Sequence, residues 1–213
     1  MDGSPEKNTL VDKEERRSQI LEAAKRSFSE KGYHATTGAD IIGAAGIARG
    51  TFYLYFDRKR GIFEALLEQL FALLRGKIRR IDLSTGTVES VVEQVHLNVD
   101  GIIGALISER ALTKILICEA VGLDAGFDGK VFDFYNRVNL LLRGSLELGS
   151  AMGILRPFDA RVVSSSMLGS VKEVLYHYVM GDELPDQAAI VREVMNYNLY
   201  GILSESQRIT RSA

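Results

Sequence analysis

Long stretches of this chain carry apolar residues three and four positions apart, and runs that alternate apolar and polar residues are few. A period near 3.6 places apolar side chains on one face of an α-helix, whereas a strand needs a period of two. Only 3 of the 213 residues are proline, so few of these stretches contain a residue that would end a helix. The spacing therefore predicts an all-α protein.

Breaks that mostly contain glycine divide the sequence into its expected helices. Residues 1–11 are expected to form a flexible arm, and Asp12 and Glu15 have the spacing of a capping box that would open a helix over about 13–31. Asp57 is expected to cap a long helix, 57–81. The other helices are expected at about 37–45, 48–56, 87–107, 109–121, 127–152, 158–180 and 186–206.

Residues 37–56 have the pattern of a helix-turn-helix, in which two short helices flank a turn that contains glycine. Thr37 and Asp40 again have capping-box spacing, and Gly46 interrupts the first helix. The second helix begins near Ala48 and includes the aromatic stretch TFYLYF. The pattern predicts a module that places its second helix in the major groove of DNA.

The aromatic residues of the second helix divide between two faces. Phe52 and Phe56 share one face by their i,i+4 spacing. Tyr53 and Tyr55 are expected to point away from it. Arg49, near the start of the helix, has the fork of donors that binds O6 and N7 of guanine. The predicted DNA-contacting residues are Thr37, Arg49, Gly50, Thr51, Tyr53, Leu54, Tyr55 and Lys59.

The other members of this set have chemical reasons of their own. Thr51 and the tyrosine hydroxyls can bond phosphate oxygens, and Leu54 can meet a thymine methyl group. Thr37 caps a helix N-terminus, which attracts anions, and Lys59 adds a phosphate contact by its charge. Gly50 lets the backbone approach the DNA closely.

Positive charge is concentrated around this module. The net charge of −2 argues against a protein that coats nucleic acid over its whole surface. Between residues 49 and 80, the basic residues Arg49, Arg58, Lys59, Arg60, Arg75, Lys77, Arg79 and Arg80 stand against Asp57, Glu64 and Glu68. The local excess suits a DNA-facing surface, and its alternative is an ordinary solvated basic face.

The segment GYHATTGADIIGAAGIARGTFYLYFDRKRGIFEAL (32–66) resembles the DNA-binding region of the tetracycline-repressor (TetR) family of bacterial regulators. The matching features are Gly32-Tyr33, Thr36-Thr37, Asp40-Ile41, Ala45-Gly46-Ile47, Gly50-Thr51-Phe52-Tyr53, Tyr55-Phe56 and Lys59. The resemblance implies about nine helices, a homodimer, a palindromic operator and an inducer pocket in the C-terminal domain. The expected domains are a DNA-binding domain with its arm (1–56), a connecting helix (57–81), and a ligand-binding and dimerisation domain (82–213).

Two places depart from the family pattern. The family usually has Ser or Thr where this chain has Ala48, so the second helix lacks a side-chain cap, which costs about 1 kcal/mol. Family members often carry a polar or basic residue near Gly38 or Ala39, and both residues are small here. DNA readout is therefore expected to rest on the second helix.

The last two expected helices, over 158–180 and 186–206, are apolar on nearly all sides. A helix that is apolar all round is buried all round, and these helices come late in a small domain. We therefore expect them to pack against a second copy, as a four-helix bundle across a two-fold axis. The expected interface residues are Gly169, Val171, Tyr178, Val194, Tyr197, Asn198 and Gly201; the alternative is that some face the protomer's own core.

Polar residues within apolar helical patterns are candidates for a ligand pocket, because helix bundles hold small molecules in their interiors. The candidates are His96, Asp100, Glu119, Tyr135, Asn139, Arg143, Tyr176 and His177. The apolar residues around them predict a small, largely hydrophobic ligand. Each candidate taken alone has the alternative of being a satisfied core residue, a dimer contact or a surface residue.

Motifs for catalysis, metals and nucleotides are missing from the sequence. There is no GxSxG, HExxH or GxGxxG, and the histidines do not cluster with Cys118 or with carboxylates at ligand spacing. We expect no enzyme activity, no cofactor and no metal. A single cysteine, no apolar run of roughly 18 residues and no secretory signal predict a cytoplasmic location.

These observations predict a transcriptional repressor that binds a palindromic operator in double-stranded DNA as a homodimer and is released by a small hydrophobic effector, with no membrane partner. The alternative keeps the fold and changes the role. It is a helix-turn-helix protein that acts through a protein partner without a small-molecule inducer. An apolar pocket without convergent polar groups would favour this alternative.

Overall fold

The structure is a computed structural model that describes residues 5–82, 87–119, 125–181 and 186–202, and nine α-helices follow one another in these ranges. They are α1 (Pro5–Lys31), α2 (Gly38–Ala45), α3 (Arg49–Tyr55), α4 (Lys59–Lys77), α5 (Val88–Ser108), α6 (Arg110–Lys114), α7 (Ala125–Ala151), α8 (Ala160–Met180) and α9 (Gln187–Ile202). A π-helical turn, Ile115–Glu119, directly follows α6. The all-α prediction is confirmed. Within the described ranges, no helix has both the length and the apolar character needed to span a membrane.

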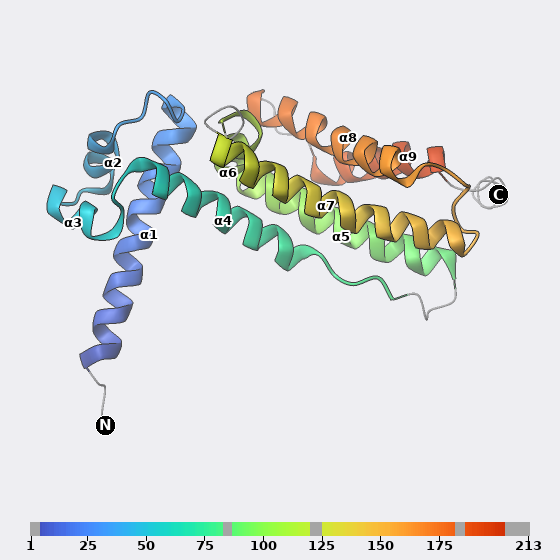
Figure 1. The fold of residues 1–213 in the computed structure, drawn as a ribbon, viewed down its shortest axis with the longest axis horizontal. Coiled ribbons are helices and arrows are strands. Elements are labelled where there is room, and N and C mark those ends of the chain that lie inside the picture. Colours follow the sequence, from blue (N-terminus) through green and yellow to red (C-terminus); the bar gives the residue numbers. More distant parts are fainter. Residues whose placement is uncertain (1–4, 83–86, 120–124, 182–185, 203–213) are drawn as a thin grey trace.

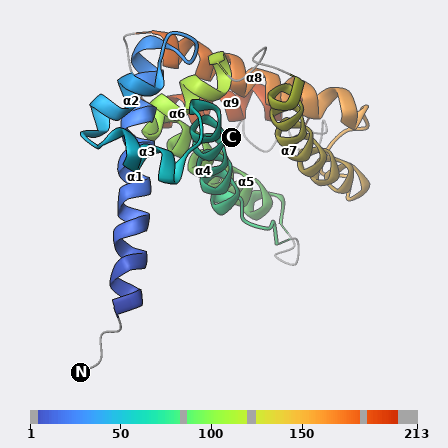
Figure 2. The same ribbon diagram turned by 60° about the vertical axis from the view of Figure 1, so that its left-hand side comes forward.

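The helices form two groups (Figure 1). The first three lie together at one end, and α4 runs from them towards the second group, α5 to α9. Within the second group, α7 packs along α8, and α5 packs along α9. Figure 2 shows α7 beside α8 and set apart from α4 and α5.

One hydrophobic core joins the two groups. It contains Phe28 of α1, Phe52 of α3 and Phe63 of α4, together with Leu106 of α5 and Ile115 of the π-helical turn. Burial of such large side chains contributes roughly 1.5–3 kcal/mol each. The end of the molecule that holds α1 to α3 is therefore packed onto the bundle as well as covalently joined to it.

Polar contacts between α1 and α6 reinforce this junction. Lys25 Nζ lies 3.3 Å from a carboxylate oxygen of Glu109, the residue before α6. Lys114 Nζ donates to the backbone carbonyl of Ser29 at 2.9 Å. Neighbouring carboxylates raise the pKa of Lys25 although burial, the largest single influence, lowers it.

The first helix begins earlier than the sequence predicts. α1 starts at Pro5, so residues 5–11, which we expected in a flexible arm, belong to the helix, and Asp12 is not its N-cap. Proline fits the first position of a helix because its missing N–H needs no partner there, and Glu6 and Lys7, which are good helix formers, follow it. The predicted end is confirmed, since Gly32 follows Lys31 with a φ of 81°.

The connecting helix is shorter than predicted at both ends. α4 starts after Arg58 instead of Asp57, and Arg58 provides no side-chain cap. At its other end, the helix stops at Lys77 and the chain becomes extended at Ile78, with φ of −81° and ψ of 113°.

Side-chain amides on α5 explain why the chain leaves the helix there. Asn98 accepts the backbone N–H of Arg79 at 2.9 Å and donates to the carbonyl of the same residue at 2.8 Å. Gln94, one turn earlier on α5, makes the same pair of bonds with Asp82 at 2.6 and 2.9 Å. The two amides replace the helical partners of this backbone, so residues 79–82 lie along α5 in an extended form.

Candidate nucleic-acid interface

The start of α2 is fixed by the capping box that the sequence predicts. The backbone N–H of Asp40 donates to Thr37 Oγ1 at 3.2 Å, and the N–H of Thr37 donates to Asp40 Oδ2 at 2.8 Å. Lys31 Nζ lies 2.7 Å from Asp40 Oδ1. Lys31, and next Thr37, hold the pKa of the Asp40 carboxyl well below its ordinary value. This end of α2 keeps its charge and its geometry across the neutral pH range.

The turn between α2 and α3 depends on one glycine. Gly46 has a φ of 64°, in the left-handed region that side chains with a Cβ avoid. Its N–H donates to the carbonyl of Gly43 at 3.2 Å, and the N–H of Ile47 donates to that of Ile42 at 3.4 Å. These bonds end α2 and turn the chain into α3.

One side of helix α3 is buried in the core, and the other side is exposed to solvent. Phe52 is only 1% exposed, and Phe56 lies in the same core. On the outer side, Leu54 is 80% exposed and Tyr53 is 48% exposed. The guanidinium of Arg49 lies over the Tyr53 ring, 5.8 Å from its centroid, so the ring limits where this side chain points. Gly50 is also exposed, and Thr51 is half-buried.

Tyr55 lies differently from its predicted position. It is half-buried and packs against the hydrophobic core instead of pointing away from it. The reason is that α1 extends past α3 on that side. Tyr55 and Leu54 line a hollow whose other wall is α1, with Asp12, Lys13, Glu15, Arg16 and Gln19. A DNA contact by the Tyr55 hydroxyl stays a prediction.

Lys59 holds the loop before α2. Its ammonium group donates to the backbone carbonyls of Tyr33 at 2.6 Å, His34 at 3.2 Å and Thr36 at 2.8 Å. It also lies 4.3 Å from the centre of the Tyr33 ring, and burial lowers its pKa. An ammonium has three N–H donors, so all three are used within the protein. Lys59 therefore positions this loop. A direct contact of Lys59 with a DNA phosphate stays a prediction.

Two further residues position the helices, and we did not predict them from the sequence. Thr36 is fully buried, with Oγ1 2.7 Å from the Gly32 carbonyl and 3.1 Å from that of Ser27, which fixes the loop against α1. Gln19 on α1 donates to the carbonyl of Ala45 at 2.7 Å, at the end of α2. Only the Thr36-Thr37 pair gave a local signal, because Ala45, which Gln19 bonds at the end of α2, lies far from Gln19 in sequence.

The predicted ligand-pocket residues whose side chains the structure describes do not converge. His96, Tyr176 and His177 are exposed, and His177 lies 3.3 Å from Glu173 on the same helix. Asp100 accepts a bond from Gln187 at 2.9 Å, which joins α5 to α9. The side chain of Glu119 lies outside the described residues.

The candidates on α7 have partners within the protein. Asn139 accepts from Ser164 at 2.7 Å and donates to Ser165 at 2.9 Å, so it joins α7 to α8. Arg143 pairs with Glu147 on the same helix at 2.9 Å. Tyr135 is half-buried, and its burial, with a smaller effect of Cys118, raises its pKa to about 12. These residues serve structural contacts in the described structure.

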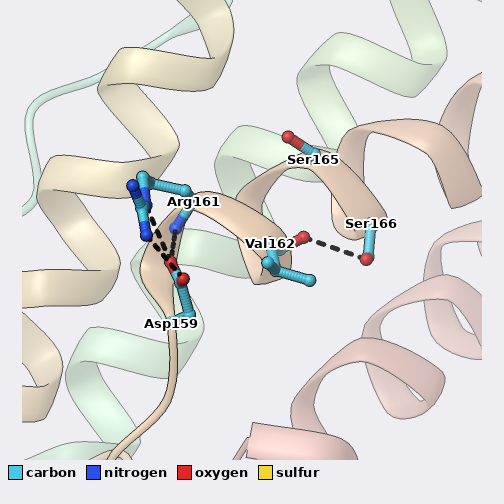
Figure 3. A pocket seen from close by; sticks show the side chains of 5 residues that line it. All are labelled: Asp159, Arg161, Val162, Ser165 and Ser166. Atoms are coloured by element: carbon cyan, nitrogen blue, oxygen red, sulfur yellow. Dashed lines mark hydrogen bonds and ion pairs between the residues drawn. The ribbon is translucent and has the colours of Figure 1, made fainter.

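A surface hollow at the start of α8 offers little to a charged ligand. Figure 3 shows its lining of Asp159, Arg161, Val162, Ser165 and Ser166. Arg161 is already paired with Asp159 at 2.9 Å, and this pairing lowers the pKa of the Asp159 carboxyl to about 2. None of the seven predicted pocket residues with described side chains lines this hollow.

Helix α7 has an apolar face that the sequence analysis did not single out. Phe134 stacks on Phe71 of α4, with ring centroids 3.9 Å apart. Leu141 and Leu148 follow Phe134 at intervals of seven, so all three lie on one side of the helix. Unlike Phe134, Leu141 is 59% exposed and Leu148 is 47% exposed. Met152, the residue after the end of α7, is 46% exposed. The helix thus contacts α4 near one end and leaves the continuation of the same face open.

The predicted dimer residues differ in their exposure to solvent. Gly169 and Tyr197 are exposed, and Val171, Tyr178 and Asn198 are half-buried. Val194 is buried in the protomer's own second core, with Ile103 of α5 and Ile190, Val191 and Met195 of α9. It packs inward because α9 lies along α5, so it is not available to a second copy. The surroundings of Gly201 lie outside the described residues.

Known proteins resemble this chain in sequence and in fold. Residues 20–66 match the family described as bacterial regulatory proteins, tetR family. The uncharacterized HTH-type transcriptional regulator YdgC of Bacillus subtilis (strain 168) is 26% identical over 197 residues, which cover 92% of this chain and 96% of that protein. The fatty acid metabolism regulator protein of the same strain is 25% identical over 185 residues, covering 86% and 94%. A crystal structure of the transcriptional regulator FadR from Bacillus subtilis in complex with stearoyl-CoA shares the fold, with a TM-score of 0.71 and 24% identity over 86% of this chain and 98% of that one.

Proposed function

We propose, on the premise that this chain belongs to the TetR family of helix-turn-helix transcriptional regulators, that it is a repressor whose ligand is an acyl-CoA. It binds a palindromic operator as a homodimer, and the ligand releases it. In this proposal residues 1–56 read DNA, the connecting region 57–81 carries α4, and residues 82–213 bind the ligand and form the dimer. No enzyme activity is part of the proposal, because the matching family consists of regulatory proteins.

The division of α3 carries the DNA-binding part of the proposal. Phe52 is buried, whereas Leu54, two residues later, is almost fully exposed beside Arg49 and Tyr53. An apolar side chain, a guanidinium and a phenol on one rigid helix suit a thymine methyl, a guanine edge and a phosphate in turn. Each of these three contacts is a proposal for the bound state.

A dimer is needed because one such helix reads only half of a palindromic site. Two copies must place their α3 helices about 34–36 Å apart, one turn of DNA. The exposed Gly169 on α8 and Tyr197 on α9 support an interface built from these two helices. Val194 is left out of the proposed interface because it faces the core.

The open apolar face of α7 supports the ligand class. Leu141 and Leu148 of α7, with Met152 directly after the end of the helix, offer a row of apolar surface more than two turns long, which suits an extended fatty chain. One relative is a fatty acid metabolism regulator, and the FadR structure contains stearoyl-CoA. A long-chain acyl-CoA is therefore the ligand class we propose, with the chain between α7 and α4.

Release follows if the ligand changes the position of α4. The stacked pair Phe71 and Phe134 joins α4 to α7 at the closed end of this face, and Lys130 of α7 pairs with Glu64 of α4 at 3.1 Å. A fatty chain that enters beside the stack would push the helices apart and move the head, α1 to α3, to which α4 is joined. The ligand and the operator then favour different states, and each weakens binding of the other.

Selection of bound fragments from sheared genomic DNA, followed by titration with stearoyl-CoA, tests the proposal. We expect a palindromic motif, a steep dependence of affinity on salt and loss of binding in Arg49→Ala/Tyr53→Ala. Stearoyl-CoA should release the wild-type protein, and Leu141→Asp should resist release. Val162→Asp is the matched control, because Val162 is 61% exposed on α8, as much as Leu141 on α7.

Two outcomes would redirect the proposal. Binding without sequence preference, or unchanged in the double variant, would mean that α3 does not read DNA. A clear operator that neither stearoyl-CoA nor stearic acid releases would favour the second candidate function, a DNA-bound protein that acts through a protein partner. The predicted polar pocket residues support this candidate, because they do not converge.

A further inference from the structure

The end of α4 and the extended chain after it carry four cations within six residues. Arg75, Lys77, Arg79 and Arg80, which we call the basic segment, are all exposed. None of the four has an acidic partner among the described residues. By contrast, Arg60 of α4 and Lys130 and Arg143 of α7 form ion pairs with glutamates. Four unpaired cations in so short a stretch repel one another, and a bound polyanion would relieve this repulsion.

The backbone of the basic segment is held in place before any ligand arrives. The paired amide bonds from Asn98 and Gln94 fix residues 79 and 82 onto α5, as described above. Because the chain is already ordered, an anion that binds there has to immobilise only side chains. Such preorganisation favours binding over a flexible basic tail of the same charge.

Arg75 points the basic segment towards the open face of α7. It follows Phe71 by four residues on α4 and therefore lies on the same side of the helix. That side faces α7, because the Phe71 ring stacks on Phe134. Leu141 and Leu148 lie roughly 10 and 21 Å beyond Phe134 along α7, and Arg75 to Arg80 extend roughly 6 to 20 Å beyond Phe71. The cations and the exposed leucines thus lie at similar distances from the stack of Phe71 on Phe134.

DNA read by α3 does not reach this segment. Arg75 is 16 residues along from the start of α4 at Lys59, which corresponds to about 24 Å of helix. Figure 1 places α3 and the end of α4 at opposite ends of that helix. An anion bound by this segment would therefore belong to another molecule.

We propose that the basic segment binds the phosphate groups of coenzyme A while the fatty chain of the same ligand lies against Leu141 and Leu148. The inference rests on the proposed acyl-CoA function and adds its recognition of the thioester over the free acid. A pyrophosphate and a 3′-phosphate supply the charge that four cations require. Arginine suits them because its planar fork bonds phosphate oxygens in pairs.

Calorimetric titration of the full-length protein with stearoyl-CoA, stearic acid and coenzyme A tests the inference. The wild type should bind stearoyl-CoA at least tenfold more tightly than stearic acid, with an affinity that falls as salt rises. Arg79→Ala/Arg80→Ala should lose at least tenfold in affinity for stearoyl-CoA and keep its affinity for stearic acid. Arg75→Ala alone should show the same selectivity with a smaller loss.

Controls separate this inference from a folding defect. Arg26→Ala/Arg192→Ala removes two exposed cations from α1 and α9 and should bind all three compounds as the wild type does. Operator affinity without ligand should be unchanged in the variants of Arg75, Arg79 and Arg80, because these residues lie outside α1 to α3. A variant that loses operator binding as well would be replaced by Arg79→Gln/Arg80→Gln, which removes the charge and keeps a longer, polar side chain than alanine has.

The pattern of results distinguishes the inference from the function on which it rests. Equal stearoyl-CoA affinity in the wild type and in Arg79→Ala/Arg80→Ala would overturn the basic segment as the phosphate site and leave the acyl-CoA function standing. Equal affinity of the wild type for stearic acid and stearoyl-CoA would do the same. If the wild type binds none of the three compounds, the acyl-CoA function itself fails, and the inference fails with it.

Discussion

The inner side of the head, α1 to α3, and the outward side of α7 differ in whether their apolar residues are buried. In the head, Phe28 and Phe52 are buried, and even the loop before α2 has partners, through Thr36 and Lys59. On α7, Leu141 and Leu148 remain in contact with water. A surface that must match one DNA groove is best rigid before binding, whereas a site for a fatty chain has to leave apolar surface open. The comparison suggests that stability is concentrated in the head and binding capacity in the bundle.

Replacing a buried and an exposed residue of the same helix gives the largest contrast. Phe52→Ala removes a fully buried ring from the core of the head and should lower the free energy of unfolding by about 3–5 kcal/mol. Leu54→Ala, two residues later, should change it by less than about 0.5 kcal/mol because Leu54 already lies in water. Urea denaturation followed by circular dichroism measures both.

The exposed residue should matter for DNA recognition instead of stability. Leu54→Ala should keep its fold and lose discrimination at one base pair of the operator, measured by titration against single-base variants. A loss of stability in Leu54→Ala comparable to that in Phe52→Ala would show that the outer side of α3 is packed. The division between the buried and the reading side would then be wrong.

Lys59 tests whether the loop before α2 is held as tightly as the helices. Lys59→Met keeps most of the side-chain volume and removes three hydrogen bonds to the carbonyls of Tyr33, His34 and Thr36. We expect a loss of about 1–3 kcal/mol in the free energy of unfolding, since the carbonyls lose a charged partner. Arg58→Met, next to it and exposed, is the control and should change stability little.

Operator affinity separates positioning from direct contact at Lys59. If its only task is to hold the loop, Lys59→Met should weaken binding without changing the slope of affinity against salt. A slope reduced by about one contact would instead indicate that its ammonium reaches a phosphate in the complex. A variant as stable as the wild type would mean that this loop needs no such clamp.

Local patterns predicted the head better than the rest of the molecule. Thr37 with Asp40, and Gly46 after Ala45, act through neighbours within four residues, so their spacing alone indicates what they do. The buried and exposed sides of α3 at Phe52 and Leu54 likewise follow from helical periodicity.

Features that depend on distant partners could not be predicted in the same way. Lys59 bonds a loop more than twenty residues away, and Asn98 decides where α4 ends from another helix. Val194 faces inward only because α9 lies along α5. The polar residues expected in a pocket, such as Asn139, turned out to join helices, since a polar residue in an apolar pattern signals a partner without naming it.

Ala48 offers a way to strengthen the head. Its backbone has φ of −68° and ψ of 147°, the extended geometry of an N-cap, but it has no side-chain acceptor. Ala48→Ser should therefore stabilise the protein by about 1 kcal/mol, because its hydroxyl can accept an N–H of the first turn of α3. Thermal denaturation measures the gain. Ala44→Ser, exposed within α2, is the control and should give no stabilisation, since serine is a weaker helix former than alanine.

The smallest expected effect compares two capping carboxylates, Asp40 of the head and Asp159 of the bundle. In the folded protein the pKa of Asp40 is held well below its ordinary value by Lys31 and Thr37, and that of Asp159 is lowered to about 2 by Arg161. A carboxyl with a lowered pKa stabilises the fold above its unfolded pKa, about 3.9, and this contribution disappears as pH falls through the folded pKa.

Urea midpoints measured between pH 5 and pH 2 check this dependence. The wild type should lose stability as pH falls below about 4, and Asp40→Asn and Asp159→Asn should each flatten that decline at the cost of a lower midpoint at pH 5. Asp159 is exposed and Asp40 is half-buried at the surface, so salt should reduce both effects. We expect the larger change for Asp40, because its carboxylate also completes the capping box with Thr37, whereas Asp159 bonds only within its own turn. An equal change in the two variants would show that the capping box adds nothing to the charge pair, and that the head is no more tightly built than the bundle at this point.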